Sequence, residues 1–301
     1  TIDKKVQEGA NWGKANDANI GDTVNFETTI NVIDGQPKNY VLHDKMSDGL
    51  TLDATSVKVY RNGTVLTTGY TLVTNAEDKC TFEIRFADGT LVANDVVKVT
   101  YSAILNEKAV IAGVGNPNET QLTYGNNAHT EWDKTTTYTY KFDLVKTKAD
   151  NTLLTGAEFK LYDAKTGGNE IALVKEADGT YRVATGAEKN AEGFQPATIE
   201  AGSVTIKGLD SGTYYLEETK APAGYNVLPG RVEVKIEGAN LNATVTDNTW
   251  TDGGVHVINQ TGTELPSTGG IGTTIFYVLG SVLVVAAGVL LVTKKRMDGK
   301  A

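Results

Sequence analysis

Cysteine and histidine are scarce in this 301-residue chain, which has one cysteine and three histidines. The single cysteine, Cys80, excludes an intramolecular disulfide, the usual covalent brace of exported proteins. His43, His129 and His256 show no ligand spacing among themselves and no cysteine partner, so we predict no metal site. Each histidine is interpreted as a surface residue.

An excess of positive charge is also missing. The formal net charge is -9, and the basic residues form no stripe that could neutralise phosphates, so nucleic acid is not an expected partner. No constellation of nucleophile, metal ligands or phosphate-binding loop is visible either. The chain is therefore not expected to be an enzyme acting on an external substrate, and no cofactor is expected.

Charged residues are absent from Ile271 to Thr293. A helix of this length, at about 1.5 Å per residue, matches the roughly 30 Å hydrocarbon thickness of a bilayer. Lys294, Lys295 and Arg296 follow directly, and such basic clusters remain cytoplasmic. The pattern predicts a membrane-spanning helix over 271–293, with residues 1 to about 270 outside the cell.

A short motif stands just before this span, formed by Leu265, Pro266, Ser267, Thr268 and Gly269. Together with the apolar span and the basic tail, it resembles the LPxTG sorting signal of Gram-positive surface proteins, here residues 263–301. The resemblance implies that a sortase cysteine attacks the Thr268 carbonyl and that residues 269–301 are lost. Thr268 would then pass to an amine on peptidoglycan precursor or on another subunit. The implied location is the cell wall, and the chain would be the sortase's substrate.

Short alternating segments separated by turn residues fill the remainder of the chain and predict an all-β fold. We expect two tandem immunoglobulin-like β-sandwiches, residues 1–135 and 140–262, followed by the C-terminal transmembrane helix. In the first, the turn around Asn62-Gly63 predicts a hairpin, and Cys80 is predicted to face inward on a strand. Asp133 to Thr139 is interpreted as the linker.

Residues 214–225 read YYLEETKAPAGY and resemble the E-box, YxLxETxAPxGY, of Gram-positive pilins and collagen-adhesin B-type domains. In that family a lysine on the first strand joins an asparagine on the last strand as an isopeptide, with the E-box glutamate as catalyst. Alternation assigns Lys146, Asn259 and Glu218, because each shares its strand face with apolar neighbours. A buried amine is held neutral and nucleophilic. Glu218 would donate a hydrogen bond to the Asn259 carbonyl and pass a proton to the leaving ammonia.

The first sandwich carries looser motifs, at Ile20 to Val24, Asp44 to Leu50 and Leu122 to Asn126. They resemble the middle domain of backbone pilins, which is related to collagen-adhesin A-type domains. That resemblance implies a second isopeptide between an early lysine and a late asparagine. Strand-face alternation prefers Lys4 over Lys5 and Asn126 over Asn127, with Asp44 as the acid, and both choices remain open.

The resemblance implies a shaft subunit of a sortase-assembled pilus, with a sortase, other pilin subunits and peptidoglycan as partners. The alternative is a monomeric wall-anchored adhesin or minor anchoring pilin that binds host extracellular matrix. Head-to-tail joining requires an acceptor lysine, which the family carries in a YPK-type motif. Pro37-Lys38-Asn39 lacks the flanking residues of that motif, so we expect the acceptor lysine upstream of Thr1.

Overall fold

The structure, a computed structural model, describes residues 1–33, 38–74, 76–238 and 255–259. The predicted sorting signal, with its LPSTG residues, the helix expected over 271–293 and the basic tail, lies outside the described residues. Within the described part, no helix is long and apolar enough to cross a membrane.

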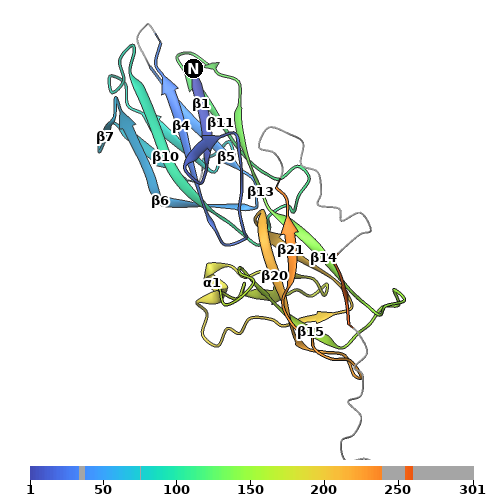
Figure 1. Ribbon diagram of the computed structural model, residues 1–301. Coiled ribbons are helices and arrows are strands. Elements are labelled where there is room, and N and C mark those ends of the chain that lie inside the picture. Colours follow the sequence, from blue (N-terminus) through green and yellow to red (C-terminus); the bar gives the residue numbers. More distant parts are fainter. Residues whose placement is uncertain (34–37, 75, 239–254, 260–301) are drawn as a thin grey trace, which may run out of the picture. The chain divides into compact units, whose positions relative to one another are not determined.

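Two facing sheets form the first sandwich (Figure 1). One sheet has the strand order β2 (Asn11–Gly13), β1 (Ile2–Glu8), β4 (Thr23–Asn31), β10 (Val96–Leu105), β6 (Leu50–Arg61) and β7 (Thr64–Leu66). The other has the order β3 (Ala15–Asp17), β13 (Asp133–Tyr138), β11 (Asn116–Tyr124), β5 (Val41–Met46), β9 (Phe82–Phe86) and β8 (Tyr70–Val73), with β12 (Ala128–His129) paired to β11.

The second sandwich is built in the same way from two smaller sheets. Its first sheet has the order β16 (Leu173–Lys175), β17 (Tyr181–Val183), β19 (Ser203–Leu209), β14 (Tyr140–Thr147) and β22 (Val255–Ile258). Its second sheet has the order β18 (Ile199–Ala201), β15 (Ala157–Tyr162), β20 (Gly212–Lys220) and β21 (Val232–Ile236). One short helix, α1 (Gly186–Lys189), is closed by a capping box between Thr185 and Glu188.

Strict alternation of buried and exposed side chains forms the cores. On β4, for example, Val24, Phe26, Thr28 and Ile30 are buried, while the residues between them are partly or fully exposed. A strand with this period buries one face against the facing sheet and leaves the other toward solvent. The predicted all-β class with two immunoglobulin-like sandwiches is confirmed, and so is the hairpin, in which Arg61 pairs with Thr64.

Two local expectations were wrong. Asp133 to Tyr138 is strand β13 and not a linker, because it pairs with β11 and, in parallel, with β3. Its threonines suit a pleated strand, since side chains branched at Cβ pack well against their neighbours there. Only Thr139 separates β13 from β14. Cys80 is buried, but it lies in the turn before β9 and not on the strand.

Gly49 allows the loop before β6 to approach a buried asparagine closely. A Cβ at this position would lie 2.2 Å from Oδ1 of Asn116 and 2.8 Å from Cα of Ala109. Asn116 cannot move freely, because its side chain exchanges hydrogen bonds of 2.8 and 3.0 Å with the backbone of Val110. The close approach therefore requires glycine.

We expect Gly49→Ala to lower the free energy of unfolding by about 1–3 kcal/mol, because the added methyl group overpacks a closed contact. Gly186→Ala is the matched control, since a Cβ there would meet no atom within 4 Å. The two variants are compared by urea denaturation. Equal midpoints would contradict the role given to Gly49.

Candidate cross-linking sites

Lys4 and Asp44 form a fully buried pair inside the first sandwich. Lys4 lies on β1 and Asp44 on β5, so the pair connects the two facing sheets. Nζ of Lys4 donates to Oδ2 of Asp44 at 2.6 Å, and both side chains are completely inaccessible to solvent. Lys5, the alternative, is a half-exposed residue that pairs with Asp3 at the surface. The structure therefore brings Lys4 and Asp44 together.

The Tyr101 hydroxyl, which the sequence analysis missed, joins this pair. It accepts a hydrogen bond from Nζ of Lys4 and donates to Oδ2 of Asp44 at 2.5 Å. The Tyr101 ring stacks on Phe26 and meets the edge of Phe82, with centroids 5.5 and 4.9 Å apart. Aromatic rings thus form the walls around the polar contact, and water is excluded from it.

Burial moves the ionisation of the three groups in the direction of their neutral forms. Loss of hydration lowers the pKa of Lys4, opposed by the Asp44 carboxylate. The same cause raises the pKa of Asp44, opposed by Lys4, and raises that of Tyr101 well above its usual value. A charged form is penalised in each case because the apolar core solvates it poorly. The site therefore favours an uncharged amine beside a protonated carboxyl group.

Asn118 occupies the place that the sequence analysis assigned to Asn126. It is fully buried on β11, and its Nδ2 donates to the Tyr101 hydroxyl at 3.3 Å. Its Oδ1 has no hydrogen-bond partner among the described residues. Asn126 is exposed in the turn after β11, as is Asn127. The choice of Asn126 was therefore wrong. Six residues of β11 follow Asn118, each adding about 3.3 Å, and Asn126 lies beyond the end of that strand.

The error in choosing the asparagine has a simple origin. Asn118 and Asn126 have the same parity, so alternation places both on one face if the strand continues, but β11 ends at Tyr124. A signal for a buried asparagine was present on β11. Asn116, Asn118 and Thr120 are polar, yet they share the inward face with the apolar Leu122. For Tyr101, alternation on β10 predicts an inward ring but says nothing about partners of its hydroxyl.

In the second sandwich the structure brings together Lys146, Glu218 and Asn259, all buried. Lys146 on β14 lies opposite Val257 on the parallel strand β22, and Asn259 directly follows that strand. Nζ of Lys146 donates to the Val257 carbonyl at 2.8 Å, so the amine points along the strand that leads to Asn259. Glu218 reaches them from β20 in the other sheet.

The carboxyl group of Glu218 is fixed by the groups around it. Its Oε2 accepts hydrogen bonds of 2.9 Å from Nδ2 of Asn259 and from the Leu228 N–H. The second oxygen, Oε1, is buried and has no hydrogen-bond partner in the described part of the chain. The acid thus contacts the amide nitrogen of Asn259, where the sequence analysis expected a contact with the carbonyl. Burial lowers the pKa of Lys146, opposed by the charge of Glu218.

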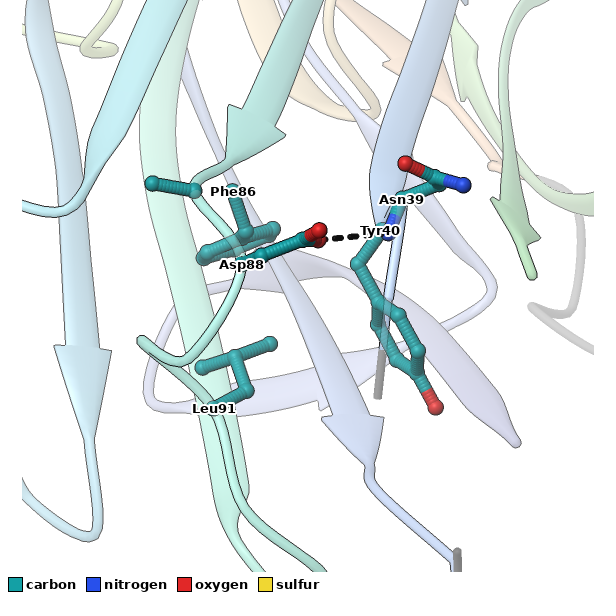
Figure 2. Close-up of a pocket in the computed structure, with 6 residues that line it drawn as sticks. Asn39, Tyr40, Phe86, Asp88 and Leu91 are labelled. Atoms are coloured by element: carbon teal, nitrogen blue, oxygen red, sulfur yellow. Dashed lines mark hydrogen bonds between the residues drawn. The ribbon is translucent and has the colours of Figure 1, made fainter. Parts of the chain in front are cut away.

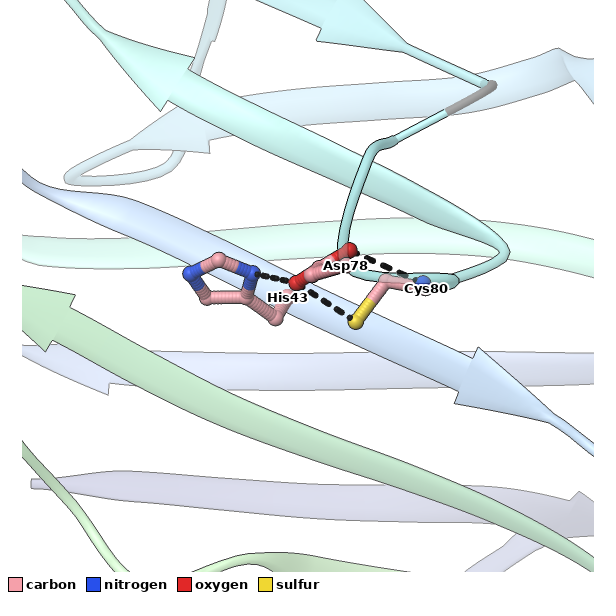
Figure 3. A group of neighbouring side chains, drawn as sticks. All are labelled: His43, Asp78 and Cys80. Carbon is pink, nitrogen blue, oxygen red and sulfur yellow. Dashed lines mark hydrogen bonds and ion pairs between the residues drawn. The ribbon is translucent and has the colours of Figure 1, made fainter.

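His43, Asp78 and Cys80 gather on the first sandwich (Figure 3), so His43 is a partly exposed residue with a cysteine neighbour that the sequence analysis did not expect. The Cys80 thiol donates to Oδ2 of Asp78 at 3.1 Å, and Nδ1 of His43 lies 2.8 Å from the same oxygen. Burial and the Asp78 hydrogen bond raise the pKa of Cys80 to about 12. A thiol held in its protonated form is a poor nucleophile, so this cluster is not a catalytic triad.

A small hollow between Tyr40, Phe86 and Leu91 is the other concave feature of interest (Figure 2). It has no enclosed space for even a water-sized group, so it is not a ligand pocket. Its one carboxylate, Asp88, accepts a hydrogen bond from the Asn39 N–H at 3.1 Å. It offers no set of convergent reactive groups.

Three family models match the chain in succession. Residues 20–128 match a Gram-positive pilin backbone subunit model with a Cna-B-like domain, residues 140–250 a prealbumin-like fold domain, and residues 258–299 an LPXTG cell wall anchor motif. The chain belongs to the LPXTG-anchored backbone pilins of Gram-positive bacteria. This pilin is a cell-wall-anchored surface protein of a structural family. The model for its first domain is described as Cna-B-like, whereas the sequence motifs had suggested the A-type.

Similar proteins agree with this assignment. The pilin is 27% identical to the group B streptococcus pilus 2b backbone protein, with a TM-score of 0.62 and coverage of 88% of this chain and 99% of that structure. It is also similar to the pilus backbone RrgB from Streptococcus pneumoniae, with 17% identity and a TM-score of 0.58. The match covers 86% of this chain and 100% of that one, and it shows a shared fold.

Two curated relatives are longer than this pilin. It is 24% identical to the trypsin-resistant surface T6 protein of Streptococcus pyogenes, over 86% of this chain and 61% of the relative. It is 29% identical to the fimbrial subunit type 1 of Actinomyces viscosus, over 49% and 30% of the two chains. The chain thus spans less than two thirds of the length of either relative.

Proposed function

We propose that this pilin is the shaft subunit of a sortase-assembled pilus, and that each of its sandwiches closes an intramolecular Lys–Asn isopeptide bond. One observation carries the proposal: each sandwich holds a buried lysine, a buried carboxyl group and a buried asparagine together in its core. A covalent brace of this kind suits a subunit that has no disulfide and transmits force along a fibre.

In the first sandwich the reaction joins Nζ of Lys4 to Cγ of Asn118. The neutral amine attacks the amide carbon, the Asn118 nitrogen leaves as ammonia, and a proton from the amine ends on that ammonia. Asp44 and the Tyr101 hydroxyl could carry this proton, because the hydroxyl lies within hydrogen-bond distance of the amine, the carboxyl group and the Asn118 nitrogen. Asp44 serves as the acid, and Asn118 replaces Asn126.

In the second sandwich Nζ of Lys146 attacks Cγ of Asn259, again with loss of ammonia. Glu218 is the proton carrier, and its contact with Nδ2 of Asn259 places the acid against the leaving group itself. The Leu228 N–H holds the same carboxylate oxygen and so fixes its direction. The chemistry is a single-turnover reaction of the chain with itself, so the pilin is a sortase substrate and not an enzyme toward other molecules.

The two bonds would brace their sandwiches differently. Lys4 and Asn118 lie on opposite sheets, so their bond ties the two layers together. Lys146 lies on β14 and Asn259 directly follows the neighbouring parallel strand β22, so their bond ties β22 to β14. Each closes a loop of more than a hundred residues, and loop entropy then stabilises the domain by about 4–5 kcal/mol on the estimate used for disulfides.

Thr268 is proposed as the joint between subunits. A sortase would cleave after it and transfer it to a lysine of the next pilin or, at the base, to peptidoglycan. Matrix binding by a monomeric adhesin remains the competing function, and no described feature of the first sandwich favours it.

The intact mass of the full chain should be lower than the sequence mass by two ammonia molecules, because one leaves for each bond. Glu218→Ala should restore one of them and Asn118→Ala the other. Asn126→Ala is the matched control and should restore none, since Asn126 is exposed. A chain with the unshifted sequence mass would refute both cross-links, and a restored ammonia in Asn126→Ala would refute the choice of Asn118.

Tyr101→Phe should slow formation of the Lys4–Asn118 bond by about tenfold or more, because it removes the hydroxyl that connects amine, acid and amide. Intact mass spectrometry of fresh and aged protein measures the fraction of chains that have not yet lost the ammonia of the Lys4–Asn118 bond. Tyr60→Phe is the control, as Tyr60 faces away from the core that its neighbour Val59 enters. Equal rates in both variants would exclude a role for the hydroxyl.

Cell-wall extracts should contain a ladder of high-mass species that survives boiling in detergent and requires a pilin-class sortase. Thr268→Ala should abolish the ladder, since the acyl-enzyme cannot form on an altered motif. The internal ammonia losses should persist in this variant, which separates assembly from cross-linking. A single wall-linked band in the unaltered strain would favour the monomeric adhesin.

A further inference from the structure

Three different donor groups converge beside the middle of β5 in the first sandwich. His43 comes from β5, and Asp78 and Cys80 come from the turn that precedes β9 (Figure 3). Nδ1 of His43, Oδ2 of Asp78 and Sγ of Cys80 all lie within 4.8 Å of one another. A nitrogen, a carboxylate oxygen and a sulfur in one place form a donor set that zinc accepts and that calcium or magnesium does not.

The spacing of these donors is near that of a tetrahedral zinc site. With metal–ligand bonds of about 2.0–2.3 Å, two tetrahedral ligands lie about 3.4–3.6 Å apart. In the structure, Oδ2 of Asp78 lies 2.8 Å from Nδ1 of His43 and 3.1 Å from Sγ of Cys80. Oδ2 of Asp78 would have to move away from each neighbour by less than 1 Å to admit the ion, and the three donor atoms all lie within 4.8 Å of one another.

The non-donor atom of each polar ligand is already held by another group. Nε2 of His43 lies 3.1 Å from the Thr123 hydroxyl, which leaves Nδ1 directed at the cluster. Oδ1 of Asp78 accepts the Cys80 N–H at 2.9 Å, which leaves Oδ2 directed there too. Supporting contacts of this kind orient ligands in metal sites, and an ordinary surface ion pair does not require them.

Glu83 contacts His43 but lies outside the group of three donors. Oε1 of Glu83 lies 3.2 Å from Nδ1 of His43, and Arg85 holds the other Glu83 oxygen at 2.6 Å. Glu83 and His43 are largely buried, whereas the Asp78 side chain is 42% exposed. Asp78 therefore opens a path for the ion from solvent, while the remaining ligands form the inner wall.

We propose that His43, Asp78 and Cys80 bind a zinc-class divalent cation, with the fourth coordination position open to solvent. The Cys80 sulfur coordinates as thiolate, and its proton is released to solvent as the ion enters. The ion would fasten the turn before β9 to β5, the strand that carries Asp44. That turn already contacts the cross-linking strand, because the Thr81 N–H donates to the Asp44 carbonyl at 2.7 Å. The bound ion would also cover the sulfur of Cys80, the one thiol of this exported chain.

The test uses the full chain, freed of metal with a chelator and titrated with cobalt(II), which reports thiolate ligation by a charge-transfer absorption band. The expected result is one cobalt per chain with this band, displaced by zinc, and a melting temperature raised by several degrees when zinc saturates the site. Cys80→Ser should abolish the band, and His43→Gln should weaken binding at least tenfold. His129→Gln, which alters an exposed histidine outside the cluster, should bind as the unaltered chain does.

Unaltered zinc affinity in Cys80→Ser, or absence of the charge-transfer band in the unaltered chain, would overturn the proposal. The melting temperature of each metal-free variant is measured alongside. If Cys80→Ser unfolds, His43→Gln still decides the matter, because glutamine can keep the contact with Thr123 while it removes the imidazole donor. Cobalt bound equally by His43→Gln and His129→Gln would also overturn it.

Discussion

Everything reactive in this pilin depends on the burial of an amine and a carboxyl group in an apolar core. A charged lysine or aspartate in such a place costs several kcal/mol unless it is paired. Lys4 and Asp44 avoid that cost in the neutral, hydrogen-bonded forms that burial favours, and the surrounding rings of Phe26, Phe82 and Tyr101 line the contact. The burial that raises the free energy of the charged forms also keeps the amine neutral and therefore able to act as a nucleophile. Stability and reactivity therefore have one physical origin.

The β-sandwich is well suited to this chemistry. Two sheets packed face to face direct side chains from different strands into one narrow layer, so residues distant in sequence come within bonding reach. Lys4, Tyr101 and Asn118 are brought together from three strands of two sheets. In the second sandwich the lysine and asparagine share a sheet, and the acid arrives from the opposite one. A single fold principle thus supports two geometries of cross-link.

Local contacts outside the cores serve to hold these strands in place. Lys14 bridges Asp3, Asp133 and the Lys4 carbonyl, so the strand that carries the reactive lysine is fastened to β13. The His43 cluster fastens the turn before β9 to β5 in a comparable way. Surface contacts of this kind contribute little free energy individually. They connect β1 and β5, the strands that carry Lys4 and Asp44, to neighbouring elements of the sandwich.

Sequence reasoning could reach the members of the second site, because a twelve-residue motif marks the acid and short alternating strands mark Lys146 and Asn259. It could also reach Lys4 and Asp44, since alternation separates the inward lysine from its neighbour Lys5. It failed where a strand ended: parity carried the choice past Asn118 to Asn126, although Gly125, Asn126 and Asn127 form a turn signal directly after Tyr124. Gly125 and Asn127 have positive φ in the structure, so the strand stops before the chosen asparagine.

The sequence by itself determined the all-β class, the E-box and the sorting motif, because period-two alternation and short contiguous motifs are local properties of the chain. Only the tertiary structure decided the contacts between residues far apart. It placed the Tyr101 hydroxyl among Lys4, Asp44 and Asn118, made a strand of Asp133–Tyr138, and set Cys80 beside His43. Each of these depends on how two sheets and their turns meet in space, and no spacing along the chain encodes that distance.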